Sequence, residues 1–117
     1  MENRILGLHH ITAIADDAQA NYDFYTKVLG LRLVKKTVNF DDPGTYHFYY
    51  GDETGSAGTI LTFFPWQGIG RGSTGVGMAT NIGYSVPDGS LDFWADRLRQ
   101  FNVKQENIDQ RFVEQFL

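Results

Sequence analysis

The sequence predicts an α+β fold, one βαβββ module followed by an incomplete second copy of the same pattern. Residues 5–66 place one amphipathic helical segment among four segments rich in β-branched and aromatic residues, and the opening pattern recurs after residue 77. The chain has 117 residues, 42% of them apolar, and no cysteine. It is therefore one domain or a piece of one, without disulfides or thiolate metal ligands.

The first module opens with a strand over residues 5–14, which is apolar and β-branched apart from two adjacent histidines. Asp16 and Gln19 then form the D-x-x-Q pattern of a capping box at a helix N-terminus. The helix that follows has one apolar stripe, formed by Ala18, Tyr22, Tyr25 and Leu29. Gly30 suits the left-handed position that ends a helix, so we expect the helix to stop there.

Three further strands complete the first module. Apolar and β-branched residues return over residues 31–40, and the Pro and Gly of residues 41–44 then favour a turn. Residues 45–50 and 58–64 are two more strand segments, separated by a turn that contains glycine. The first module therefore ends at residue 66.

A glycine-rich linker over residues 67–76 leads into a partial second module, residues 77–117. Residues 80–82 match residues 9–11, which predicts a strand that opens this module. Further matching pairs are Asp17 with Asp88, Phe24 with Phe93, and Leu29 with Leu98. Strand, turn and helix agree in order, so we interpret the pattern as an internal duplication.

The second copy is incomplete. Its helix has an apolar stripe, formed by Leu91, Trp94, Leu98 and Phe101. Only one strand is expected after it, at residues 112–117. Missing strands leave sheet edges unpaired, a state that natural chains avoid. We therefore expect the chain either to borrow strands from another copy, as a homo-oligomer, or to lack further C-terminal modules.

The charge pattern excludes several partners. Ten basic and fourteen acidic side chains give a formal charge of −4, and no more than two basic residues are adjacent, Lys35 and Lys36. Nucleic acid rewards a clustered basic face, so we expect no nucleic-acid partner. There is no apolar run of the length that spans a membrane and no signal-peptide pattern at the start. We therefore expect a cytoplasmic protein with no membrane association.

The His9-His10 pair is the first candidate for chemistry, because imidazole binds metals and exchanges protons near neutral pH. Side chains alternate across a strand, so His10 shares a face with Thr12 and His9 shares the other face with Ile11. Only one of the two histidines is then expected to face any given cavity. Spacing alone leaves open whether they bind a metal or are core histidines. His47, which lies among aromatic residues, is interpreted as structural.

Six segments of the chain match known patterns in order. Residues 8–12 (LHHIT), 21–25 and 29–34 lie within the duplicated pattern, and this combination resembles the glyoxalase/bleomycin-resistance/extradiol dioxygenase superfamily, the vicinal oxygen chelate proteins. Within it, three segments resemble the N-terminal part of the hydroquinone-type ring-cleaving dioxygenases. These are residues 35–42, 46–52 and 58–66.

This resemblance implies a curled sheet of paired modules around Fe(II), with Mn(II) as the alternative metal. It implies a reaction of dioxygen with a small aromatic diol or hydroquinone. By the family pattern His10 is a metal ligand, and His9 and Thr12 lie close to the substrate, with His9 as a candidate proton acceptor. The chain would then be the N-terminal portion of an Fe(II)-dependent ring-cleaving dioxygenase of the extradiol type.

Two departures from the family pattern qualify this expectation. Thr62 stands where the glyoxalase branch has a glutamate ligand, and Asn81 stands where a histidine of the second copy would be. In the ring-cleaving branch the other ligands come from a later module, beyond Leu117, so we expect this chain alone to be inactive. Two other functions stay open, a glyoxalase-like metal-dependent lyase or isomerase, which Thr62 disfavours, and a metal-free aromatic-ligand-binding module of the bleomycin-resistance type.

Overall fold

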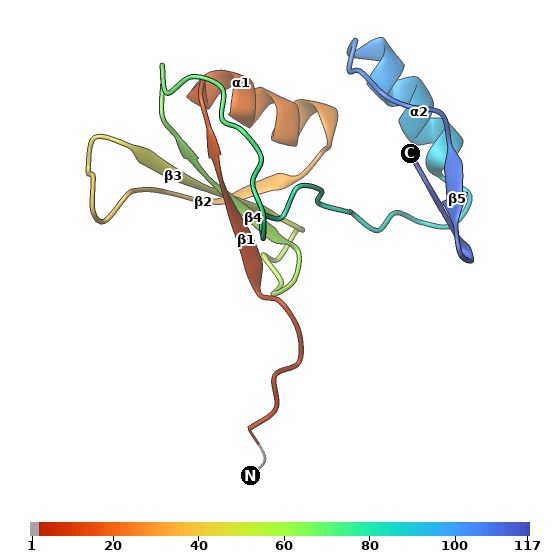
Figure 1. The fold of residues 1–117 in the computed structure, drawn as a ribbon, viewed down its shortest axis with the longest axis horizontal. Coiled ribbons are helices and arrows are strands. Elements are labelled where there is room, and N and C mark those ends of the chain that lie inside the picture. The colour runs from red at the N-terminus through yellow and green to blue at the C-terminus, as the bar shows by residue number, and fades with distance from the viewer. Residues whose placement is uncertain (1–2) are drawn as a thin grey trace. The chain divides into compact units, whose positions relative to one another are not determined.

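The structure is a computed structural model that describes residues 3–117 (Figure 1). The chain divides into two compact units, unit 1 ending at Arg71 and unit 2 running from Gly72 to Leu117. Within the described residues, no helix has both the length and the apolar character needed to cross a membrane.

Unit 1 is a four-stranded sheet with one helical segment packed on one face (Figure 1). Its elements are β1 (His10–Ala15), α1 (Ala18–Asp23), η1 (Phe24–Val28), β2 (Arg32–Val38), β3 (Tyr46–Gly51) and β4 (Ile60–Pro65). The strand order is β1-β4-β3-β2, with β1 parallel to β4 and the other pairs antiparallel. The predicted α+β fold and the βαβββ order are confirmed.

The core of unit 1 lies between the sheet and the helical segment. It is formed by Phe48, Tyr50, Leu61 and Phe63 from the sheet, against which Ala18, Tyr22 and Tyr25 pack. The Tyr50 hydroxyl donates to the side-chain oxygen of Asn21, 2.8 Å away. Burial raises the pKa of Tyr50 well above its ordinary value, so this hydroxyl keeps its proton and fixes α1 against the sheet.

The helix begins one residue later than predicted. Asp17 is the N-cap, and its carboxylate accepts a hydrogen bond from the backbone N–H of Ala20 at 2.6 Å. The capping box predicted at Asp16 and Gln19 is wrong. Asp16 instead accepts from the backbone N–H of Gly68 at 2.5 Å, so the segment that follows β4 occupies the carboxylate that the pattern assigned to the cap.

The second part of the helical segment, η1, is a π-helix. The backbone N–H of Leu29 donates to the carbonyl of Phe24, five residues earlier, at 3.1 Å. Gly30 follows with φ +72°, and the N–H of Leu31 donates to the carbonyl of Tyr25 at 2.9 Å. The helix therefore ends at Gly30 as predicted, with a left-handed glycine closing it.

The first strand is shorter than predicted. The ladder between β1 and β4 starts with the pair His10 and Ile60, whereas Ile5 and Leu6 are 98% and 93% exposed. The β-branched and apolar character of residues 5–9 therefore does not make them a strand, because the paired part of β4 begins only at Ile60. His9 precedes the strand, although its carbonyl accepts from the N–H of Gly58 at 2.7 Å.

A β-bulge in β2 changes which side chains reach each face of the sheet. Leu33 pairs with Tyr50 and Lys35 pairs with Tyr49, so the register shifts between these two positions. Leu33 packs against the core, and without the bulge Lys35, two residues on, would point to the same side. The extra residue instead turns Lys35 toward the face that the helix does not cover.

Unit 2 contains α2 (Leu91–Gln100) and a hairpin of β5 (Asp109–Arg111) and β6 (Glu114–Phe116). The predicted second helix is confirmed. The strand predicted at residues 80–82 is wrong, because residues 78–87 form neither helix nor strand and have no partner strand among the described residues. The single strand predicted at residues 112–117 is a hairpin instead, with Phe112 in its turn at φ 54°.

Candidate functional site

The face of the sheet opposite α1 carries polar side chains beside a few apolar ones such as Phe64, and it is where the candidate residues gather. His10 and Thr12 lie on it from β1, because Ile11, Ala13 and Ala15 point to the core instead. This confirms that His10 and Thr12 share a face. Pairing of Thr12 with Thr62 of β4, and of Thr62 with Tyr49 of β3, brings three strands together there. We call this surface the polar face.

Four side chains on the polar face form one continuous chain of hydrogen-bonding groups. The hydroxyl of Tyr49 lies 3.0 Å from Nδ1 of His47, and Nε2 of the same ring lies 3.1 Å from Oγ1 of Thr62. Oγ1 of Thr62 in turn lies 2.8 Å from Oγ1 of Thr12. Tyr49 and His47 are half-buried, Thr62 is completely buried, and Thr12 at the end of the series is exposed.

His47 is held by aromatic contacts as well as by hydrogen bonds. Its ring stacks on Phe64 with a centroid separation of 3.9 Å and lies 4.2 Å from the ring of Tyr49. Burial lowers the pKa of His47, and the positive charges of Lys35 and His10 lower it further. His47 is therefore a neutral imidazole at neutral pH, with one nitrogen that donates and one that accepts.

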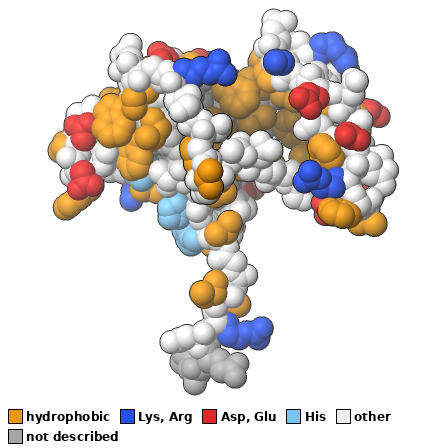
Figure 2. All heavy atoms as spheres, viewed as in Figure 1, with side chains coloured by type: hydrophobic (Ala, Val, Ile, Leu, Met, Phe, Trp, Pro, Cys, Tyr) orange, Lys and Arg blue, Asp and Glu red, His pale blue; other side chains and the backbone are white. Residues whose placement is uncertain are grey.

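His9 and His10 both lie at the exposed end of β1. Their Nδ1 atoms are 3.1 Å apart and their rings meet edge to face at 5.3 Å. Figure 2 shows histidine side chains (pale blue) open to solvent next to the N-terminal segment. The expectation that alternation would separate the two rings is wrong, because His9 lies outside the strand and its side chain is not bound by the strand's period.

The described residues do not by themselves fit a complete metal site. Among residues 3–117, no group of three or more His, Cys, Asp or Glu side chains is placed to hold one ion. A mononuclear non-haem iron site needs two histidines and a carboxylate. His9 and His10 offer two imidazoles, and Thr62, the position where a glutamate was considered, has a hydroxyl that is already bonded to Thr12 and His47.

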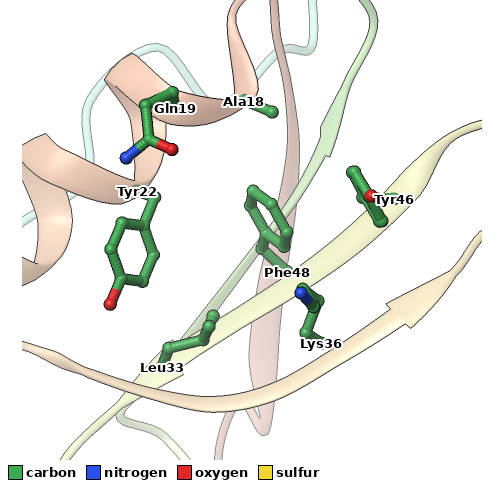
Figure 3. A pocket seen from close by; sticks show the side chains of 7 residues that line it. All are labelled: Ala18, Gln19, Tyr22, Leu33, Lys36, Tyr46 and Phe48. Atoms are coloured by element: carbon green, nitrogen blue, oxygen red, sulfur yellow. The ribbon is translucent and has the colours of Figure 1, made fainter.

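A pocket of about 390 Å³ lies on the other side of the sheet, between α1 and the strands β2 and β3 (Figure 3). It is lined by Ala18, Gln19, Tyr22, Leu33, Lys36, Tyr46 and Phe48. None of the predicted site residues lies in it. The ammonium of Lys36 lies 5.6 Å from the ring centroid of Tyr46, which stacks on Phe48 at 5.6 Å, so the pocket combines aromatic walls with one cation.

Sequence reasoning did not name Tyr49 and Lys35 as candidates for the polar face. His47 was interpreted as structural, and its hydrogen bonds and ring contacts agree with that interpretation. The spacing of two between His47 and Tyr49 in a strand would have put them on one face. Lys35 gave no such signal, because only the bulge brings its ammonium to 5.3 Å from the ring centroid of Tyr49.

The match of the sequence to a family profile gives the class of protein. Residues 7–111 match the sequence profile of the Glyoxalase/Bleomycin resistance protein/Dioxygenase superfamily, and the chain belongs to this superfamily. The predicted resemblance is therefore confirmed at the level of the superfamily.

Individual relatives of the chain carry more specific names than the superfamily does. The chain is 62% identical to the "Putative ring-cleaving dioxygenase MhqE" of Bacillus subtilis (strain 168) over 100 residues, which cover 86% of this chain and 33% of that protein. It is 38% identical to the chlorohydroquinone/hydroquinone 1,2-dioxygenase of Sphingobium indicum over 119 residues, which cover 100% of this chain and 37% of that protein. A crystal structure of a "putative dioxygenase" from Bacillus subtilis superposes with a TM-score of 0.91 at 54% identity. The superposition covers 97% of this chain and 36% of that one. The chain thus spans about a third of the length of the curated relatives it matches.

Proposed function

We propose that the chain is the N-terminal portion of a metal-dependent ring-cleaving dioxygenase that acts on an aromatic diol or hydroquinone. The observation that carries this proposal is the placement of His10 and Thr12 together on the polar face of the sheet. Relatives of the chain are named a putative ring-cleaving dioxygenase and a hydroquinone dioxygenase, which supports the same reaction. His10 would be one metal ligand, and His9 and Thr12 would lie beside the substrate. Fe(II) is the proposed metal, with Mn(II) as the alternative.

The geometry supports specific roles for these side chains. The His9 and His10 rings are exposed and share one end of β1, so both are open to a ligand on that side. Thr12 is exposed next to them and is bonded from beneath by Thr62, which leaves the outer side of its hydroxyl for a substrate. The remaining metal ligands would come from residues outside this chain, in keeping with the share of the relatives that it spans.

A second part of the proposal concerns how the chain is divided into modules. We propose that residues 1–66 are one complete module, that residues 67–76 are a linker and that residues 77–117 are part of a second copy. β1 and β2 are the two edges of the sheet in the described part of the chain. A second copy of the chain or a further module could extend it, as in the expected homo-oligomer.

The proposal is tested by metal content and oxygen uptake. We expect the 117-residue chain to hold no stoichiometric iron and to consume no oxygen with hydroquinone. The protein produced from the complete coding sequence that carries this chain should do both, and His10→Ala should reduce both to background. Lys36→Ala, on the opposite face of the same sheet, is the matched control and should change neither. A stoichiometric and active metal in the His10→Ala variant would contradict the proposal.

The aromatic pocket favours one second candidate, a metal-free module that binds an aromatic ligand. Tyr22, Tyr46 and Phe48 form its walls and Lys36 supplies a positive charge. In that case His10→Ala would leave binding of an aromatic ligand nearly unchanged, and Lys36→Ala would weaken the binding of an anionic one. The same two variants therefore separate the two functions, and equilibrium dialysis with a benzoate or a phenolate measures the second.

A further inference from the structure

We propose that His47 is a positioning residue for the Thr12 hydroxyl, acting through Thr62 so that Thr12 presents a fixed hydrogen-bond donor to the open side of the polar face. The role of Thr12 beside a substrate rests on the proposed function. The orientation of its hydroxyl does not, because it follows from contacts within unit 1 alone.

The central link of this chain is Thr62, which has no exposed surface. No solvent reaches its hydroxyl, so its hydrogen-bonding partners are Nε2 of His47 at 3.1 Å and Oγ1 of Thr12 at 2.8 Å. A hydroxyl has one proton, so Thr62 donates to one of these atoms and accepts from the other. The orientation of Thr62 therefore ties the tautomer of His47 to the role of Thr12.

Because His47 is neutral, all the hydrogen bonds of the series from Tyr49 to Thr12 must run in the same direction. Burial is the main cause of its lowered pKa, and the charges of Lys35 and His10 act in the same sense. A neutral imidazole donates from one nitrogen and accepts at the other. Only two arrangements are then consistent along the whole chain: protons point from Tyr49 through His47 and Thr62 toward Thr12, or all of them point the opposite way.

The first arrangement is favoured by the chemistry of the two ends. A phenolic hydroxyl is a more acidic donor than an alcohol, and its oxygen is a poorer acceptor than an alcohol oxygen. Tyr49 at one end therefore donates to Nδ1 of His47 better than it accepts from it. Nε2 of His47 then holds the ring proton and donates to Thr62, and Thr62 donates to Thr12.

In this arrangement Thr12 accepts from Thr62 and cannot donate back to it. The proton of Thr12 is then left to be donated on the exposed side of the polar face, where His10 of the same strand also lies. The substrate atom that meets Thr12 is therefore an acceptor, and a deprotonated ring oxygen suits it because hydrogen bonds to an anionic oxygen are the stronger ones.

The position of the ring proton tests the direction. In the 117-residue chain, with histidine labelled with ¹⁵N, long-range proton–nitrogen spectra at pH 7.5 should show His47 as one tautomer, with the proton on Nε2 and an acceptor at Nδ1. Tyr49→Phe should shift the Nδ1 resonance toward that of an unbonded nitrogen. Tyr46→Phe, three residues earlier in β3 and on the core side, should leave it unchanged. A proton on Nδ1, or an equal response to the two variants, would overturn the inference.

The Thr62 hydroxyl tests the second half of the chain. It is buried and bonded, so its proton should exchange slowly and show contacts to the Thr12 side chain. Thr12→Val, at an exposed position, should remove that protected signal while the His47 tautomer stays, and Thr12→Ser should restore it. A Thr62 proton unaffected by Thr12→Val contradicts the proposal. Neither experiment needs metal or turnover. The other His47 tautomer would therefore overturn this inference alone, and a failed oxygen-uptake assay would overturn only the proposed function.

Discussion

Unit 1 and unit 2 carry matching sequence patterns, yet only unit 1 has an interior. All the buried side chains among the described residues lie in unit 1, and in residues 72–117 none is buried. Both units have a helix with an apolar stripe. The stripe of the first helix meets four aromatic and aliphatic side chains of a sheet, whereas no side chain of α2 is buried. Most of the stability of an amphipathic helix comes from the packing of its apolar face, and among the described residues only the first helix has a sheet packed on that face.

The largest expected effect is a loss of stability when one large apolar side chain is removed from each unit in turn. Phe63 is 6% exposed at the centre of the core and its ring lies 4.8 Å from that of Tyr25. We expect Phe63→Ala to lower the free energy of unfolding by about 3–5 kcal/mol, because it removes buried area and leaves a cavity. Trp94→Ala, in the stripe of α2, should change it by no more than about 0.5 kcal/mol.

Urea denaturation followed by far-UV circular dichroism measures both variants. If the two substitutions cost the same, unit 2 has an interior that the structure does not show, and the contrast between the units fails.

A smaller test concerns the two aspartates that the internal duplication aligns. Asp17 caps α1 through its bond to the N–H of Ala20, whereas Asp88 lies in a turn two residues before Ser90, the residue at the N-cap position of α2, which makes no side-chain cap. We expect Asp17→Ala to lower the free energy of unfolding by about 1 kcal/mol. Asp88→Ala should stay within about 0.5 kcal/mol.

Thermal unfolding at one pH compares the two aspartate variants directly. Equal losses would mean that the duplication extends to the start of the helix, and would weaken the contrast at this position.

The contrast also explains which parts of the structure could be predicted from the sequence. Apolar, β-branched and aromatic residues bounded by turn residues placed all four strands of unit 1. The strand predicted at residues 80–82 rested on the match to residues 9–11, and it is wrong because this segment has no partner strand among the described residues. In the same way, the strand was predicted to begin at Ile5, because a sequence pattern does not show where the ladder with β4 starts.

The candidate site was predicted only as far as local sequence allows. Alternation along one strand correctly put His10 and Thr12 together. It could not find that His47 reaches Thr12 through Thr62, because this contact depends on the pairing of β1, β3 and β4 across long stretches of the chain. Lys35 was hidden for another reason, since a bulge reverses the side that its position in the strand indicates.

The smallest expected effect is a dependence of stability on pH that belongs to unit 1, which contains all three histidines of the chain. The pKa of His47 is lowered in the folded state by burial and by the charges of Lys35 and His10, whereas the unfolded chain has the ordinary value of about 6.5. Below that pH the unfolded state binds more protons than the folded state, so stability falls as the pH drops through about 6.5 and is fully present above it.

Urea midpoints between about pH 7.5 and 5, which span the ordinary histidine range, measure this slope. His47→Gln should flatten it and His9→Gln, at the exposed end of β1, should leave it in place. The tyrosine near-UV signal should follow the loss, because Tyr49 and the core tyrosines all lie in unit 1. A slope that survives His47→Gln would assign the acid sensitivity to another group, and the polar face would then not be what acid weakens first.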